Sequence, residues 1–300
     1  MLSVTMAALN AAQKEMNVTS NNLANASTVG FKRSYVNFGD VFSNDPASNP
    51  STAVGSGVLV TGVSRDTTAG ALKSTGRVTD MAIDGSGYFV TQDPAGGPST
   101  FTRAGNFSID AKGNLVDPSG FAVQGFSPVL FTPTNPPGPA YITANDAAST
   151  TVPNPNMGTI NIPISIGATG AAATAFPAGA LEAPTGVTPV VPATPIVLQS
   201  VSISPKGEVQ ATYSDNKTYT MRFVAVANFP NAQGLKAIGN NRYTQTGLSG
   251  AASITGAGAP DAANIMTGTL EQANVDITNE LMDMIRSQQV YNGNARMLQT

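Results

Sequence analysis

The strongest constraint on the fold is an apolar stripe that occurs at both ends of the chain. Its positions are spaced alternately four and three residues apart, as are the a and d positions of a coiled-coil helix. The N-terminal positions are Leu2, Met6, Leu9, Gln13, Met16, Ser20 and Leu23, and the C-terminal positions are Ile277, Leu281, Met284, Gln288, Tyr291, Ala295 and Leu298. The pattern therefore predicts one amphipathic helix at each end.

Capping residues mark the predicted helix boundaries. The run 21–28, which is rich in Asn, Ser and Thr, and the following Gly30 would end the first helix. Asp276 or Thr278 can cap the second helix, and Glu280 suits the positive end of its dipole. Either helix alone is marginally stable in water, so we expect both to be largely disordered in the free monomer. Matching stripes favour a terminal pair that also packs between subunits, although two helices on one globular core remain an alternative.

The sequence between the helices is typical of β-structure, with short β-branched and aromatic runs separated by turn residues. Two Lys-Gly pairs, within 107–116 and 201–210, predict hairpins whose glycine takes a positive φ. A third hairpin is expected to turn at Asp215 and Asn216. The predicted fold class is mixed α and β, with a coiled-coil-like stem of terminal helices and a mainly antiparallel β body that resembles a sandwich or barrel.

Composition divides the chain further, because residues 128–195 hold 13 of its 21 prolines and only two charged residues. Proline is excluded from helix interiors and central strands, so this stretch is predicted to be a variable insert. The expected parts are a helical assembly domain (1–30 plus 271–300), an extended connector (31–75), a β-rich domain (76–127 plus 196–270) and the insert (128–195).

No residue pattern indicates catalysis or a cofactor. The chain has no Cys, His or Trp, which excludes thiol chemistry and histidine-based acid–base or metal chemistry. The triplet 85–87 (Gly-Ser-Gly) lacks the next glycine and the helix of a phosphate loop, so a hairpin turn is preferred. Asp80 and Asp84 would lie about 13 Å apart along a strand, beyond the reach of a glycosidase pair. We expect no enzyme, no cofactor and no metal site.

Charge and hydropathy exclude two classes of partner. The net charge is −3 and only 11% of residues are charged, so no basic surface is available for nucleic acid or an anionic membrane. No run of about 20 apolar residues predicts membrane insertion. The first residues lack the basic start of a cleaved signal peptide. The chain is expected to be cytosolic or exported without such a signal.

Motifs at both ends resemble those of the flagellar rod and hook protein family. The residues that carry the likeness are Asn21, Asn22, Asn25, Gly30, Phe31, Asn274 and Val275. Hook subunits are more similar to the chain than rod subunits are, because of the stretches 62–66 and 225–229 and the presence of an insert. The resemblance implies a structural subunit of the bacterial flagellar hook, which polymerises into a flexible tube and transmits motor torque to the filament.

The same resemblance implies where the chain works and what it contacts. Its partners would be copies of itself, neighbouring rod and hook–filament junction proteins and a hook cap, after export by the flagellar type III apparatus. A basal-body rod subunit is the alternative, and a surface adhesin is a more remote one. The assembly residues would be those of the inner helical layer, namely Leu2, Met6, Leu9, Met16, Leu23, Ile277, Leu281, Met284, Tyr291 and Leu298.

Overall fold

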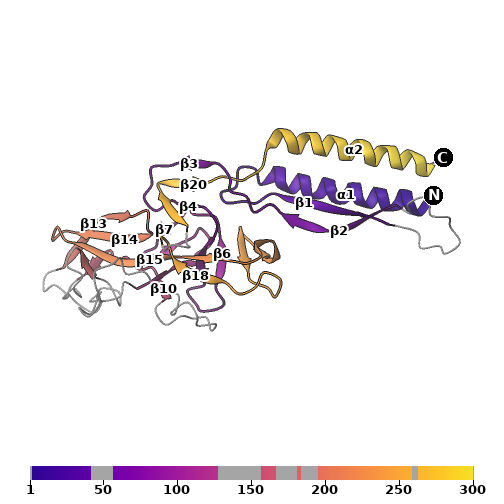
Figure 1. Cartoon of the computed structure of the whole chain (residues 1–300). Coiled ribbons are helices and arrows are strands. Elements are labelled where there is room, and N and C mark those ends of the chain that lie inside the picture. Colours follow the sequence, from indigo (N-terminus) through magenta and orange to yellow (C-terminus); the bar gives the residue numbers. More distant parts are fainter. Residues whose placement is uncertain are drawn as a thin grey trace. The chain divides into compact units, whose positions relative to one another are not determined.

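The computed structural model describes residues 2–41, 57–127, 157–166, 181–183, 195–258 and 263–299. The chain forms two structural units (Figure 1). The first, called the terminal unit, comprises Met1–Ala71 and Gln272–Thr300, and the second, called the β unit, comprises Leu72–Glu271. The β unit is thus a continuous stretch of chain, whereas the terminal unit is built from both ends.

The terminal unit contains both predicted helices. Helix α1 spans Leu2–Ala24 and α2 spans Ile277–Gln299. Strands β1 (Ser34–Asp40) and β2 (Val58–Arg65) form an antiparallel pair. Figure 1 shows α1 lying between α2 and this strand pair, with the N- and C-terminal ends of the chain close together, so the two helices run antiparallel.

The predicted helix boundaries are confirmed. Helix α1 ends at Ala24, and Gly30 lies beyond it with a φ of 67°. At the start of α2, the Asp276 carboxylate accepts hydrogen bonds from the backbone N–H groups of Thr278 (2.9 Å) and Asn279 (3.3 Å). Asp276 rather than Thr278 is therefore the N-cap, because its side chain satisfies two amides that have no partner within the helix.

The β unit confirms the mainly antiparallel β body. Its described strands are β3 Leu72–Ser74, β4 Met81–Asp84, β5 Tyr88–Gln92, β6 Thr100–Thr102, β7 Ser108–Ile109, β8 Leu115–Val116, β9 Ala122–Phe126, β10 Met157–Thr159, β11 Ser165–Ile166, β12 Leu181–Ala183, β13 Ile196–Ile203, β14 Glu208–Tyr213, β15 Thr218–Asn228, β16 Lys236–Gly239, β17 Arg242–Thr244, β18 Ser253–Gly256, β19 Asn264–Thr267 and β20 Thr269–Glu271. In the largest sheet the main path of paired strands runs β11-β13-β14-β15-β9-β5-β6-β17-β16.

The three predicted hairpins are present. Strands β7 and β8 pair around Gly113 (φ 84°), and β13 and β14 pair around Gly207 (φ 73°). Strands β14 and β15 pair around Asn216 (φ 59°). Glycine is also required sterically at 207, since a Cβ there would lie 2.6 Å from the Cβ of Ala257. Gly113 and Gly207 therefore have the positive φ that the sequence predicted, and Asn216 adopts the left-handed backbone as well.

The structure differs from the sequence prediction in the connector and in the triplet 85–87. The stretch predicted as an extended connector contains β1 and β2, which pair with each other and pack on α1. Gly85–Gly87 do not form a hairpin turn, because β4 pairs with β19 whereas β5 pairs with β6, β9 and β15. The triplet connects two different sheets, with Gly85 and Gly87 at φ values of 119° and 130°.

Part of the predicted insert belongs to the core of the β unit. Ile160, Ile162 and Ile166 are fully buried in the same apolar cluster as Met81 and Phe89. Strand β10, just before them, pairs with β9. The remaining parts of the insert, residues 128–156, 167–180 and 184–194, lie outside the described residues.

A buried ion pair crosslinks distant parts of the β unit. Nη1 of Arg103 lies 3.1 Å from Oε2 of Glu271, and the two side chains are 4% and 0% exposed. Arg103 also donates to the carbonyl oxygen of Gly85 (2.7 Å), and its guanidinium lies 5.5 Å from the ring centroid of Tyr88. Such a pair depends on both partners, because either charge alone would be buried without compensation.

Candidate assembly surface

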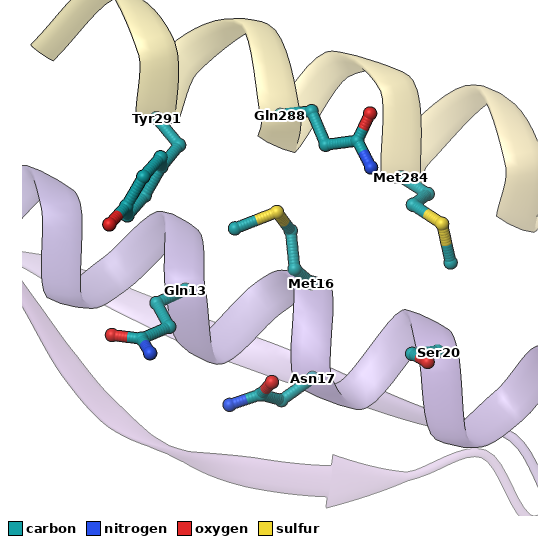
Figure 2. Close-up of a pocket in the computed structure, with 7 residues that line it drawn as sticks. All are labelled: Gln13, Met16, Asn17, Ser20, Met284, Gln288 and Tyr291. Carbon is teal, nitrogen blue, oxygen red and sulfur yellow. The ribbon is translucent and has the colours of Figure 1, made fainter. Parts of the chain in front are cut away.

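The seam between α1 and α2 is an open, partly polar groove. Gln13, Met16, Asn17 and Ser20 of α1 and Met284, Gln288 and Tyr291 of α2 surround a space of about 390 Å³. Figure 2 shows Met16 and Tyr291 pointing across the seam toward the opposite helix. The groove means that the two helices do not fill the space between them with their own side chains over this length.

The most buried positions of α2 are offset by one residue from the predicted stripe. Glu280 and Ser287, seven residues apart, are almost completely buried. Leu281 and Gln288, which the stripe places at the seam, are exposed. One residue corresponds to a rotation of about 100° in an α-helix. The buried polar positions thus lie beside the stripe, whose members Met284, Gln288 and Tyr291 line the seam, while Ile277, Leu281 and Ile285 are left uncovered.

The uncovered apolar side chains of α2 form one surface. Ile277, Leu281 and Ile285 are spaced four residues apart, so they lie on the same side of the helix. They are 51%, 43% and 54% exposed, and Met282 beside them is exposed as well. Separately from this surface, because α1 lies between α2 and the strand pair, β1 and β2 carry the exposed apolar residues Tyr35, Phe38, Leu59 and Val63. Exposed apolar side chains gathered in this way are typical of a binding surface.

The other predicted assembly residues have mixed surroundings. Met6 and Tyr291 are exposed, and Leu2 is the first residue of α1. The half-buried ones are Leu9, Met16, Leu23, Met284 and Leu298. Their part in assembly stays a prediction.

A second face of α1, which the sequence analysis did not recognise, packs on the strand pair. Ala11, Ala12 and Thr19 are buried. Thr19 and Asn22 line a small cavity of about 70 Å³ together with residues 34–36 of β1. The signal in the sequence was the recurrence of small residues seven apart, at Ala12 and Thr19, because small side chains allow close approach of a helix to a strand pair.

Where α1 ends and α2 begins, polar side chains join the two helices. Glu280 is 1% exposed. Its Oε1 accepts a hydrogen bond from Nε of Arg33, and its Oε2 accepts one from Nδ2 of Asn22 (3.2 Å). Asn22 also bonds both backbone groups of Ser34, whose carbonyl oxygen accepts at 2.7 Å and whose N–H donates at 2.9 Å. Each oxygen of the buried carboxylate thus has a partner, as a buried charge requires.

Asn274 extends this network to the loop after β2. Its Oδ1 accepts from the backbone N–H of Arg33 (2.7 Å), and its Nδ2 donates to the carbonyl oxygens of Asp66 and Thr68 (3.2 Å each). The buried Lys32 donates to the same carbonyl of Thr68. The pKa of Asp66 is lowered from its ordinary value, mainly by the hydrogen bond from the N–H of Thr68 and further by the charges of Lys32 and Arg33. We call Asn22, Lys32, Arg33, Thr68, Asn274 and Glu280 the polar latch.

The family-motif residues lie in or beside the latch. Asn22 and Asn274 are members of it. Asn25 donates to the carbonyl oxygen of Asn21 (2.9 Å), and Phe31 accepts from the N–H of Asn274 (3.4 Å). Gly30 supplies the left-handed turn described above, and Val275 is half-buried.

The partners Arg33 and Glu280 were missed as a pair by the sequence analysis. They are separated by 247 residues, so no local spacing connects them. Their one signal was that each stands in or next to a motif stretch and carries a charge opposite to the other's.

Two other kinds of site, a metal site and a membrane span, are not indicated among the described residues. No group of three or more acidic, Cys or His side chains there is placed to hold a metal ion. No helix in the parts of the chain that the structure describes has both the length and the hydropathy of a membrane span.

Three family models match the chain in order. "Flagella basal body rod protein" matches residues 2–32, "Flagellar hook protein FlgE/F/G D1 domain" matches residues 82–211, and "Flagellar basal body rod FlgEFG protein C-terminal" matches residues 266–300. Together they cover about two thirds of the chain. Both terminal matches fall on the elements that carry the latch and the helical seam.

Curated relatives match over nearly the whole chain. The flagellar basal-body rod protein FlgG of Bacillus subtilis (strain 168) is 29% identical over 301 positions, covering 96% of this chain and 89% of the relative. The flagellar hook protein FlgE of Escherichia coli (strain K12) is 27% identical over 395 positions, covering 99% and 96%. Among solved structures, the crystal structure of Helicobacter pylori flagellar hook protein FlgE2 matches with a TM-score of 0.43 and 11% identity, covering 67% of this chain and 100% of that one.

Proposed function

Because the chain belongs to the flagellar rod and hook protein family and is a structural subunit of the flagellum, we propose that it polymerises into the hook. In this role copies of the chain form a flexible tube that transmits motor torque to the filament. The family is structural, and we propose no catalytic activity, cofactor or metal for this member.

The uncovered apolar surface of α2 is the observation that carries the proposal. Ile277, Leu281 and Ile285 are each more than 40% exposed in the single chain, although they lie on a helix from the end of the chain that matches a family model. Placing these side chains against another copy would remove apolar area from water, at about 25 cal/mol per Å². A repeated contact between different surfaces of identical subunits generates a helical filament if it does not close into a ring, and a tube is a hollow assembly of this kind.

A rod subunit is the second candidate, and alignment length favours it. The alignment with the E. coli hook protein extends over 395 positions, so about a quarter of it has no counterpart among the 300 residues of this chain. The alignment with the B. subtilis rod protein extends over only 301 positions. The hook proposal rests on the stretches 62–66 and 225–229 and on the partly core-forming insert.

The same proposal includes the partners of the chain, its export route and the domain that assembles. The partners are other copies of the chain, neighbouring rod and hook–filament junction proteins and a hook cap. Export occurs through the flagellar type III apparatus without a cleaved signal peptide. The assembly domain of this proposal comprises residues 1–30 and 271–300, all of which except Glu271 belong to the terminal unit.

Electron microscopy of concentrated protein tests assembly. The wild-type chain is expected to form short tubes, and the triple variant Ile277→Ser, Leu281→Ser and Ile285→Ser is expected to stay as particles. The control is Ile238→Ser, which removes an equally exposed apolar side chain from the β unit and is expected to leave the tubes unchanged. Circular dichroism must show that each variant keeps its helices. Tubes from a folded triple variant would argue against the proposed surface. Discrete particles from the wild type would argue against polymerisation and favour a non-polymerising protein such as an adhesin.

Deletion of the gene separates the hook from the rod. If the chain forms the hook, basal bodies from the deletion strain retain a complete rod and lack only the hook. A basal body that lacks part of its rod would assign the chain to the rod instead.

A further inference from the structure

We infer that the polar latch keeps the adjacent halves of α1 and α2 folded in the free subunit, so that the disorder expected of the terminal helices is confined to their outer halves. The inner halves are residues 16–24 of α1 and 277–287 of α2, and the outer halves are residues 2–10 and 290–299. This inference concerns the single chain and does not depend on whether the chain forms a hook or a rod.

The inner halves share buried polar groups that lose their partners together if either helix unfolds. Asn22 and Glu280 are each 1% exposed and bond one another across the seam. Freeing α2 would leave Asn22 without one acceptor and Arg33 without its carboxylate. Freeing α1 would remove a donor from a buried anion. Because an uncompensated buried charge is costly, the helix ends that meet at the latch are expected to fold and unfold as one cooperative unit.

The latch also connects these ends to β1 and to the loop after β2. Asn22 bonds both backbone groups of Ser34, and Asn274 bonds the backbone of Arg33, Asp66 and Thr68. The first turn of α2 is further held by the Asp276 cap. The inner halves therefore have tertiary contacts with two other segments, which an isolated helix lacks.

The outer halves have weaker support. Residues 4–10 of α1 and 290–298 of α2 include no buried residue, whereas the inner halves contain the buried residues Thr19, Asn22, Glu280 and Ser287. Val290 and Met297 are exposed. Gly293 lies within α2 at a position where an added Cβ would meet no neighbouring atom within 4 Å, and glycine lowers helix stability by about 1 kcal/mol relative to alanine. Few buried contacts and a helix-weakening residue mark a segment that opens at low free energy.

Hydrogen exchange of the full chain at a concentration where it is monomeric tests the inference. Amides in 18–24 and 280–287 are expected to exchange at least about tenfold more slowly than those in 3–10 and 291–298. Glu280→Ala is expected to accelerate exchange in both inner halves by about 10- to 100-fold, since Arg33 is partly exposed and water moderates the loss. Gln289→Ala, an exposed change on the same helix, is the control and is expected to leave the inner halves unchanged.

Two further variants separate a latch from general destabilisation. Asn22→Ala, on α1, is expected to accelerate exchange in 280–287 of α2, and the double variant with Glu280→Ala is expected to lose less than the sum of the single losses. Gly293→Ala is expected to slow exchange about fivefold in 291–298 without affecting the inner halves. The inference is refuted by uniform protection along both helices, by the absence of protection in the inner halves, or by effects of Asn22→Ala and Glu280→Ala that each stay on their own helix.

Discussion

Replacing Glu271 by Gln would leave Arg103 as a buried cation without its anion in the β unit. Removing one partner of a buried ion pair costs about 3–5 kcal/mol. Arg103 keeps the carbonyl oxygens of Gly85 (2.7 Å) and Ile83 (3.4 Å) as acceptors, and the ring of Tyr88 stays beneath its guanidinium. The glutamine can also still accept a hydrogen bond. We therefore expect a loss near the lower limit, about 3 kcal/mol.

A double variant tests whether the loss of stability in Glu271→Gln comes from the unpaired charge of Arg103 or from altered packing. Arg103→Met combined with Glu271→Leu removes both charges and keeps similar side-chain volumes. Because no buried charge is left, the double variant is expected to lie within about 1.5 kcal/mol of the wild type, and so to be more stable than Glu271→Gln alone. Asp84→Asn, which removes an exposed charge from the same unit, is the control and is expected to change stability by less than about 0.5 kcal/mol.

Urea unfolding followed by near-ultraviolet circular dichroism provides the measurement. Tyr88, Tyr213, Tyr219 and Tyr243 lie in the β unit and the chain has no Trp, so the tyrosine signal reports mainly on this unit. A loss of about 3 kcal/mol lowers the midpoint by about 1–3 M, for a slope of about 1–3 kcal/mol per M. If Glu271→Gln unfolds within about 0.5 kcal/mol of the wild type, or the double variant is the less stable of the two, the pair does not have the role that its burial indicates.

Two other predictions concern a helix cap and a buried phenol. Asp276→Ala leaves two backbone amides at the start of α2 without partners and is expected to destabilise the terminal unit by about 1 kcal/mol. Asp276→Asn should keep most of the stability, because asparagine is also a good N-cap. Equal stability of the wild type and both variants in thermal unfolding would contradict the cap. Burial, together with Tyr219 and Asp215, raises the pKa of Tyr213 well above its ordinary value. A raised pKa gives stability that is present below the unfolded pKa of about 10 and is lost as pH rises above it, so the β unit should weaken in alkali, and Tyr213→Phe should reduce this pH dependence. An unchanged slope of stability against pH above 10 would refute that assignment.

Local patterns predicted the elements of this fold well. The terminal helices, the Asp276 cap and the three hairpins around Gly113, Gly207 and Asn216 depend on residues close together in the sequence. Spacing, capping and backbone preference act over a few residues, so one sequence is sufficient to recognise them.

Pairing over long distances in the chain could not be predicted in the same way. The triplet 85–87 resembles a hairpin turn, but the partner of β4 is β19, about 180 residues further on. Ile160 and Ile162 are core residues inside a proline-rich stretch, and composition concealed their alternation. The stripe on α2 placed Met284, Gln288 and Tyr291 at the seam, but it gave no sign that Glu280, beside the stripe, is buried against Asn22 and Arg33. The partners of a polar residue are chosen by the whole fold and not by its neighbours in sequence.

The contacts that complete the terminal unit have a consequence for the order of folding. Asn22 bonds a residue 258 positions later, whereas all chain segments of the β unit lie within one uninterrupted stretch. A chain that emerges with its N-terminus first can thus fold residues 72–271 before α2 has emerged. Contacts between residues so far apart in the sequence form late, because closing a long flexible loop costs conformational entropy. Folding of the intervening β unit lowers this cost, so the contacts form most readily after it. The surface that we propose for polymerisation would then form only after the β unit has folded. A chain that stops before Asn274 would lack α2 and therefore could not form this surface.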